Sequence, residues 1–147
     1  MKGFMALLAV LPLAVHANTN ECIRPTDAQI SALFDQWNQS LQSQDSNRML
    51  DHYAEGSILL PTVSNSLRIS PEEKRDYFKH FMANAPRGNI VTRHIQTDCN
   101  TALDSGIYEF SFASTGDKVR ARYSFSYRWV TDRWLISSHH SSVMPQG

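Results

Sequence analysis

Two adjacent histidines, His139 and His140, are the residues of this chain best suited to acid–base or ligand chemistry. They lie where polar and apolar residues alternate, which is typical of a β-strand. Because neighbouring strand residues point to opposite faces, the two imidazoles cannot hold one metal ion together, and we expect no metal site. A regular register would turn His140 toward a pocket, whereas a single β-bulge would turn His139 there. A buried histidine that is hydrogen-bonded only for structure is the alternative.

Arg93 is the candidate cation of the same pocket. It shares a strand face with Val91 and Ile95, so its guanidinium would enter an apolar environment and need an anionic partner. That partner can be a ligand carboxylate or an internal acid, and a guanidinium that reaches back to solvent needs none. Stacking surface and hydroxyl groups would come from four aromatic residues, Trp37, Tyr53, Tyr108 and Tyr127. These residues predict a site for a small molecule that can carry a carboxylate.

Acid–base catalysis has weaker support in the sequence. The chain has no Gly-x-Ser-x-Gly, Gly-x-x-x-x-Gly-Lys, His-Glu-x-x-His or Gly-x-Gly-x-x-Gly motif, so the usual hydrolase, nucleotide and zinc signatures are missing. Glu109 falls on the face opposite the aromatic residues. The other acids of the C-terminal half are expected at strand ends or turns: Asp98, Asp104, Asp117 and Asp132. Asp51 and His52 remain as candidates, with an exposed helix-end pair as the alternative. We therefore rank binding above catalysis and expect no cofactor.

Helices in the N-terminal half must hold one wall of this pocket. Thr26 can cap a helix over residues 27–43, whose apolar stripe is Ile30, Leu33, Phe34, Trp37 and Leu41. A shorter helix is expected over 46–53, followed by a strand over 57–60 and a loop over 61–69. Ser70, Pro71 and Glu73 form a strong helix start, and this third helix is expected to reach about Asn84.

The C-terminal half is expected to form the opposite wall as a sheet, because the apolar period changes to two from Asn89 onward. Thr115 and Gly116 can form a two-residue hairpin loop, which would place Glu109 opposite Arg122 and Tyr108 opposite Tyr123. One face then collects aromatic side chains and the other collects serine, arginine and glutamate. A second turn is expected at residues 131–132.

Composition limits the protein class. The chain has 147 residues, of which 41% are hydrophobic and 19% charged, so one globular domain is expected rather than a disordered chain or a coiled coil. Fourteen basic residues balance fourteen acidic ones, for a formal net charge of +0. With no excess positive charge to hold a phosphate backbone, nucleic acid is not expected as a partner.

The N-terminus predicts export. Lys2 precedes an apolar run over residues 4–15, and Val15-His16-Ala17 suits signal peptidase. A membrane anchor is the alternative, but the run has about 12 residues where a spanning helix needs about 20. We interpret residues 1–17 as a signal peptide and 18–147 as the single mature domain, periplasmic or secreted and free of the membrane after cleavage.

The two cysteines fit an exported protein. Cys22 and Cys99 both lie in the mature chain, and disulfides persist in oxidising compartments. They can pair in only one way, which would close a long loop and stabilise the fold by about 4 kcal/mol in the chain-entropy model. Two unpaired thiols are the alternative.

Helices followed by a long antiparallel sheet indicate an α+β fold whose helices cover one concave face. The element order resembles the cone-shaped nuclear transport factor 2-like superfamily. Within it, the chain is most similar to small bacterial proteins related to the association domain of calcium/calmodulin-dependent protein kinase II. The resemblance rests on segments across the mature chain: Leu33-Phe34-x-x-Trp37-Asn38, Leu59 to Asn65, Asp76-Tyr77-Phe78-x-His80-Phe81, Cys99-Asn100-Thr101-Ala102, Ala121-Arg122-Tyr123 and Trp134 to Pro145.

This resemblance implies a small-ligand-binding or self-association domain that forms a homodimer or a higher oligomer through the outer face of the sheet. The superfamily hosts many activities, so a SnoaL-like isomerase or cyclase, in which the pocket histidine moves a proton with help from Asp51, is the alternative. The kinase domain's cavity is rich in arginine, whereas the matching positions here hold Phe110, Tyr127 and Ser141. Ligand specificity therefore does not transfer with the fold.

Overall fold

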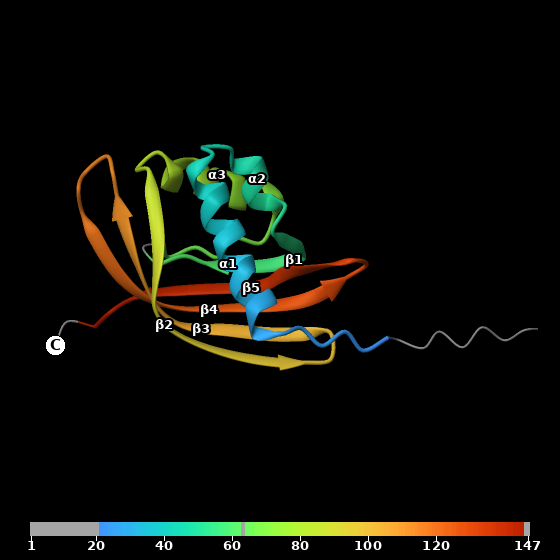
Figure 1. Ribbon diagram of the computed structural model, residues 1–147. Coiled ribbons are helices and arrows are strands. Elements are labelled where there is room, and N and C mark those ends of the chain that lie inside the picture. Colours follow the sequence, from blue (N-terminus) through green and yellow to red (C-terminus); the bar gives the residue numbers. More distant parts are fainter. Residues whose placement is uncertain (1–20, 63, 146–147) are drawn as a thin grey trace, which may run out of the picture.

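The structure is a computed structural model that describes residues 21–62 and 64–145, so the expected signal peptide lies outside the described residues. The described residues form three helices and five strands. Their bounds are α1 (Asp27–Gln42), α2 (Ser46–Leu50), β1 (Tyr53–Leu60), α3 (Pro71–Met82), β2 (Pro86–Asp98), β3 (Thr101–Phe112), β4 (Lys118–Val130) and β5 (Arg133–Val143). The helices lie together on one side of a strongly curved sheet (Figure 1). The expected α+β architecture is confirmed.

Both long helices begin where the sequence predicts. The Thr26 hydroxyl accepts a hydrogen bond from the Gln29 amide, and the Gln29 side chain accepts one from the Thr26 amide. Ser70 and Glu73 make the same reciprocal pair at the start of α3, with Pro71 in the first turn. These capping boxes satisfy amides that have no partner inside the helix, which is why local sequence is enough to locate them.

The strands form one sheet in the order β1-β5-β4-β3-β2. β1 runs parallel to β5, and the other neighbours are antiparallel. The face toward the helices carries the aromatic core, in which Phe34 and Trp37 of α1 pack against Phe125 of β4 at ring-centre distances of 6.2 and 5.5 Å. The helices and the sheet thus share one hydrophobic core that encloses the site described below.

Two expectations about the strands are wrong. Tyr53 begins β1 rather than ending the short helix. The hairpin pairs Glu109 with Arg120 and Tyr108 with Ala121, a shift of two residues from the expected register. The reason is a longer connection, because Gly116, with φ +78°, donates its amide to the Phe112 carbonyl (2.8 Å) in a loop between Phe112 and Lys118. A shift of two preserves the faces, so the aromatic side chains still point inward.

A β-bulge in β5 decides which histidine faces the helices. Ser126 pairs with Ser138 and Tyr127 with Ile136, so Ser137 is the extra residue. This insertion places His139 opposite Phe125 on the inner face and His140 opposite Ser124 on the outer face. The bulged alternative of the sequence analysis is therefore the one that the structure adopts.

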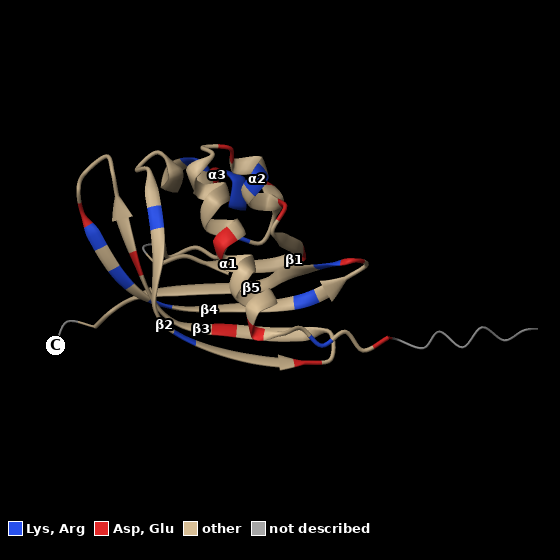
Figure 2. Ribbon diagram, in the orientation of Figure 1, with Lys and Arg blue, Asp and Glu red and all other residues tan. Residues whose placement is uncertain are grey.

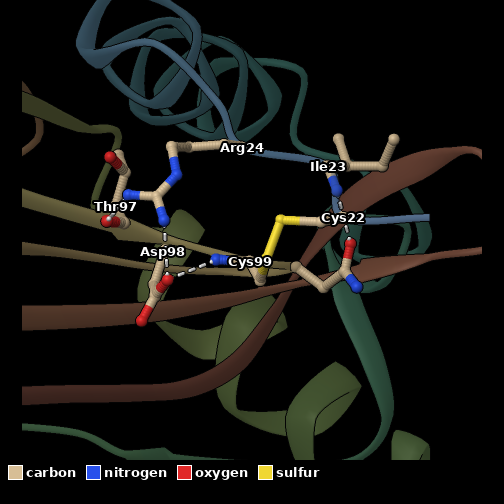
Figure 3. The surroundings of a disulfide bond; sticks show 7 residues. Cys22, Ile23, Arg24, Thr97, Asp98 and Cys99 are labelled. Carbon is tan, nitrogen blue, oxygen red and sulfur yellow. Dashed lines mark hydrogen bonds and ion pairs between the residues drawn. A yellow bond between two sulfur atoms is a disulfide. The ribbon is translucent and has the colours of Figure 1, made fainter. Parts of the chain in front are cut away.

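A disulfide joins Cys22 to Cys99, with Cα atoms 4.9 Å apart, within the range that the bond allows. Figure 3 shows the surrounding contacts, in which Arg24 forms an ion pair with Asp98 at 3.0 Å and Asp98 accepts the Cys99 amide at 2.7 Å. The Ile23 amide also donates to the Asn100 side chain at 2.9 Å. The start of the described chain is thereby tied to the β2–β3 turn, and such a bridge is typical of proteins outside reducing compartments.

Charged residues are interspersed by sign over strands and helices (Figure 2). Glu109 on β3, for example, lies between Arg120 at 2.9 Å and Lys118 at 3.7 Å. Within the described residues, no helix combines the length and the apolar composition needed to span a membrane.

Candidate functional site

A cavity of about 110 Å³ lies between α1, α3, the sheet and the segment that follows β1. Its lining residues are Trp37, Thr62, Tyr77, Phe78, Phe81, Tyr108, Phe110, Phe112, Val119, Ala121, His139 and Ser141. The aromatic rings pack against one another, with Tyr108 and Phe110 4.7 Å apart and Phe81 and Phe110 5.4 Å apart, both edge to face. Such contacts hold the rings in place, so the wall exists before any ligand arrives.

His139 is the imidazole that reaches this cavity, and it is only 4% exposed. Its ring stacks on Phe125 at 4.0 Å between ring centres. Burial lowers the pKa of His139 from 6.5 to about 3, and the neighbouring His140 adds to this effect. The imidazole is therefore neutral at physiological pH. Its Nε2 atom is buried and has no hydrogen-bond partner among the described residues.

Tyr53 and Trp37 lie behind His139 and hold its other ring nitrogen. Tyr53 Oη lies 2.9 Å from His139 Nδ1, and Trp37 Nε1 donates to the same hydroxyl at 3.2 Å. Burial raises the pKa of Tyr53 well above its usual value, so the hydroxyl keeps its proton. Trp37 lines the cavity, whereas Tyr53 is not among the lining residues. Both residues were expected in the pocket wall, and this expectation is wrong for Tyr53.

Thr62 and Ser141 bring two hydroxyl groups to the cavity near His139. Thr62 lies in the segment after β1 and Ser141 lies in β5, and their side chains are hydrogen-bonded to each other. Burial raises the pKa of Tyr108, and the nearby Ser141 side chain opposes part of that rise. Together, these residues make one polar corner in an otherwise aromatic cavity.

Arg93 has an internal partner instead of a ligand. Its Nε lies 3.2 Å from the carboxylate of Asp104, which is completely buried, and Tyr123 Oη donates to the same carboxylate at 2.9 Å. Asp104 was expected near a strand end, but it lies within β3 on the inner face. Of the options left open for Arg93, the structure shows the internal acid, and Arg93 is not among the residues that line the cavity.

The other predicted residues divide between the cavity and its surroundings. Tyr108 lines the cavity, while Tyr127 is buried elsewhere in the core, and its hydroxyl has no hydrogen-bond partner among the described residues. His140 points away from the cavity and is exposed. The structure therefore brings together Trp37, Tyr108 and His139.

Asp51 and His52 do not join the site. Asp51 is an exposed residue that follows α2. His52 Nε2 lies 2.8 Å from the Ser40 hydroxyl, and burial lowers the pKa of this imidazole. Neither residue is among those that line the cavity. Asp51 fits the alternative of an exposed helix-end residue, whereas His52 is half-buried and does not.

Within residues 21–62 and 64–145, no three His, Cys, Asp or Glu side chains are grouped closely enough to hold a metal ion. A metal with protein ligands usually takes three or four such groups. The donors that face the cavity are hydroxyl groups and one imidazole, which suit a small organic or inorganic oxygen compound better than a metal ion.

Sequence reasoning missed Thr62, Tyr77 and Ser141 as cavity residues. Ser141 could have been found, because it lies two positions from His139 and so shares its strand face. Tyr77 lies on α3 at a spacing that indicates a core position, with no signal that it lines a cavity. Thr62 lies in an irregular segment with no periodic signal, so only the folded chain places it beside Ser141.

Comparison with known proteins agrees with this architecture. The family model of the calcium/calmodulin dependent protein kinase II association domain matches residues 26–145. A Xanthomonas campestris protein named as such a domain is 38% identical, with a TM-score of 0.80 over 84% of this chain and 91% of the other. No curated protein matches this chain.

More distant solved structures share the fold. An iota-carbonic anhydrase from a cyanobacterium, in complex with bicarbonate, is 15% identical, with a TM-score of 0.74 over 84% of this chain and 95% of the other. A nuclear transport factor 2-like protein from Pseudomonas putida is 14% identical, with a TM-score of 0.70 over 81% and 88% of the two chains. With its helices packed on a curved sheet and the family match extending from α1 to the end of β5, the chain belongs to the calcium/calmodulin dependent protein kinase II association domain family.

Proposed function

We propose that the chain binds bicarbonate in the aromatic cavity and interconverts it with carbon dioxide. The observation that carries the proposal is the buried His139 Nε2, which has no partner among the described residues and belongs to a side chain that lines a small, mostly apolar cavity together with Thr62 and Ser141. A buried polar atom of this kind normally has a partner, so a ligand oxygen is the natural one. This goes further than binding alone, which the sequence analysis ranked first.

The size of the cavity supports a very small ligand. Its volume of about 110 Å³ is below the roughly 150 Å³ of an engineered cavity that accepts benzene. Bicarbonate and carbon dioxide fit within this limit, whereas the substrate of the alternative, a SnoaL-like isomerase or cyclase, would have to be no larger than benzene. That alternative also needs an ionisable group in the cavity, and the low pKa of His139 makes this imidazole a poor proton acceptor.

The cavity walls suit both partners of the reaction. Carbon dioxide is uncharged and has favourable contacts with aromatic rings, whereas bicarbonate needs hydrogen-bond donors for its oxygens. In hydration, the water oxygen bonds to the carbon of carbon dioxide, one C=O electron pair moves onto oxygen, and a proton leaves to solvent. The Thr62 and Ser141 hydroxyls can orient the water and then donate to the oxygen that gains charge. The bicarbonate complex of the fold-related carbonic anhydrase supports the choice of ligand.

Oxygen-18 exchange between carbon dioxide and water tests this function. We expect purified mature protein to accelerate the exchange. Ser141→Ala and Thr62→Val should each lower kcat/KM by about 10- to 100-fold, because each removes a hydrogen bond to a charged oxygen. Ser142→Ala is the matched control, since Ser142 points to the outer face, and it should behave as the wild type. Exchange no faster than in buffer, together with no binding of ¹³C-bicarbonate by NMR, would refute the proposal.

Self-association is a second candidate role, favoured by the uncovered outer face of the sheet. Arg122, Tyr123, Ser124, His140 and Ser142 surround a shallow depression there, and the three helices lie on the opposite side (Figure 1). We propose that two copies pair through this face to form a homodimer. We also propose that the chain is exported to the periplasm or secreted, which the disulfide and the apolar N-terminal run support.

A further inference from the structure

Three side chains form a hydrogen-bonded row that ends at the cavity. Trp37 Nε1 lies 3.2 Å from Tyr53 Oη, and Tyr53 Oη lies 2.9 Å from His139 Nδ1. Indole nitrogen can only donate, so the direction of the first bond is known. The direction of the second bond depends on which ring nitrogen of His139 carries the proton.

The two tautomers differ in how many buried hydrogen-bonding groups are left without a partner. With the proton on Nδ1, Tyr53 Oη would accept from both Trp37 and His139, so the Tyr53 proton would have no acceptor and His139 Nε2 no donor among the described residues. With the proton on Nε2, Tyr53 accepts from Trp37 and donates to Nδ1, and only the Nε2–H group lacks a partner among the described residues. Each buried polar group that lacks a hydrogen bond destabilises the arrangement that contains it. The second arrangement is therefore favoured.

We infer that Trp37 and Tyr53 hold His139 in the tautomer with its proton on Nε2, so that the cavity presents a fixed hydrogen-bond donor and not a base. Tyr53 is then a positioning residue, which acts on the ligand through His139. The inference rests on the proposed function for the identity of the ligand. It adds which kind of ligand atom can lie beside Nε2. The ligand atom beside Nε2 must be an acceptor, such as an oxygen of bicarbonate or of a short carboxylate, and an ammonium group is excluded there.

Nitrogen-15 NMR of histidine-labelled protein tests the tautomer without any ligand. In the wild type we expect His139 Nδ1 to show the shift of an unprotonated nitrogen and Nε2 that of a protonated one, with the assignment made from His139→Gln. Tyr53→Phe removes only the hydroxyl and should shift the tautomer population toward Nδ1–H. Tyr123→Phe, whose hydroxyl bonds to Asp104, is the matched control and should leave the His139 signals unchanged. A protonated Nδ1 in the wild type would overturn the inference.

Ligand titration separates this inference from the proposed function. We expect ¹³C-bicarbonate and formate to perturb the His139 Nε2 signal, methylammonium to leave it unchanged, and Tyr53→Phe to weaken bicarbonate binding at least fivefold while Tyr123→Phe does not. If Nε2 carries the proton but bicarbonate does not bind, the tautomer assignment stands and the proposed function fails. If methylammonium binds at Nε2, the donor role is wrong whatever else the cavity accepts.

Discussion

His139 and His140 have the same chemistry and opposite environments. His139 is 4% exposed and stacks on Phe125 at 4.0 Å, whereas His140 is exposed on the outer face. Removing an imidazole from water disfavours its charged form, so burial is the main reason for the low pKa of His139. The neutral ring can stack on an aromatic neighbour and hydrogen-bond through both nitrogens, which a cation in the same place could not do without a counter-ion.

The stability of the protein should therefore fall in acid because of His139. Between pH 6.5 and about 3 the unfolded chain binds a proton at this residue and the folded chain does not, so the free energy of unfolding decreases as the pH falls. The contribution is about 1.4 kcal/mol per pH unit inside this range. Urea unfolding as a function of pH should show that His139→Gln loses this slope, while His140→Gln keeps it. Equal slopes for the wild type and His139→Gln would contradict the prediction.

At the scale of elements, a buried lysine joins α3 to the sheet edge. Lys74 is 3% exposed, and its ammonium group donates to the Ser57 carbonyl of β1 at 2.7 Å and to the Ile69 carbonyl at 2.5 Å. Next to Ile69, Arg68 exchanges two backbone hydrogen bonds of 2.9 Å with Leu59. The segment that carries Thr62 is thus held between β1 and α3, which keeps the polar corner of the cavity in place.

Replacing this lysine should loosen that segment. We expect Lys74→Met to lower the free energy of unfolding by about 1–3 kcal/mol, because the buried Ser57 carbonyl and the partly buried Ile69 carbonyl lose their donor. Hydrogen exchange at the Leu59 and Arg68 amides should speed up as well. Lys79→Met, on the exposed side of α3, is the control and should stay within about 0.5 kcal/mol of the wild type. Unchanged exchange together with unchanged stability would show that Lys74 does not hold the segment.

At the scale of the whole molecule, one face of the sheet is covered by helices, and no helix of the described residues covers the other (Figure 1). The open face is mixed in character, with Arg122, Ser124 and His140 around its depression and no carboxylate among the residues that form it. Polar faces of this kind pair with a second copy when their hydrogen bonds are complementary, as in many symmetric dimers.

Light scattering should give a mass twice that of the mature chain. Arg122→Glu should weaken the dimer at least tenfold, because two-fold symmetry brings each changed residue to the interface twice. Lys79→Glu alters charge by the same amount on α3, away from this face, and should leave the dimer intact. A monomer at high micromolar concentration in the wild type would rule out the proposed interface.

The sequence by itself determined the features that depend on neighbours along the chain. The starts of α1 and α3 follow from capping boxes that close within three residues, Thr26 with Gln29 and Ser70 with Glu73. The inward aromatic face of β3 and β4 follows from alternation, which survives a register shift of two. The two cysteines had one possible pairing, and the structure contains it. Local hydrogen bonds and strand periodicity are enough to specify all of these.

Only the tertiary structure decided how the site is assembled. The bulge at Ser137 arises where β5 pairs with β1 on one side and β4 on the other, and this pairing selects His139 over His140. Arg93 of β2 forms an ion pair with Asp104 of β3. The Thr62 side chain forms a hydrogen bond with that of Ser141, which lies 79 residues further along the chain. Tyr53 belongs to a strand and not a helix because it pairs with Ile136 of β5, far along the chain. These contacts join distant segments of the chain, so no local pattern could have revealed them.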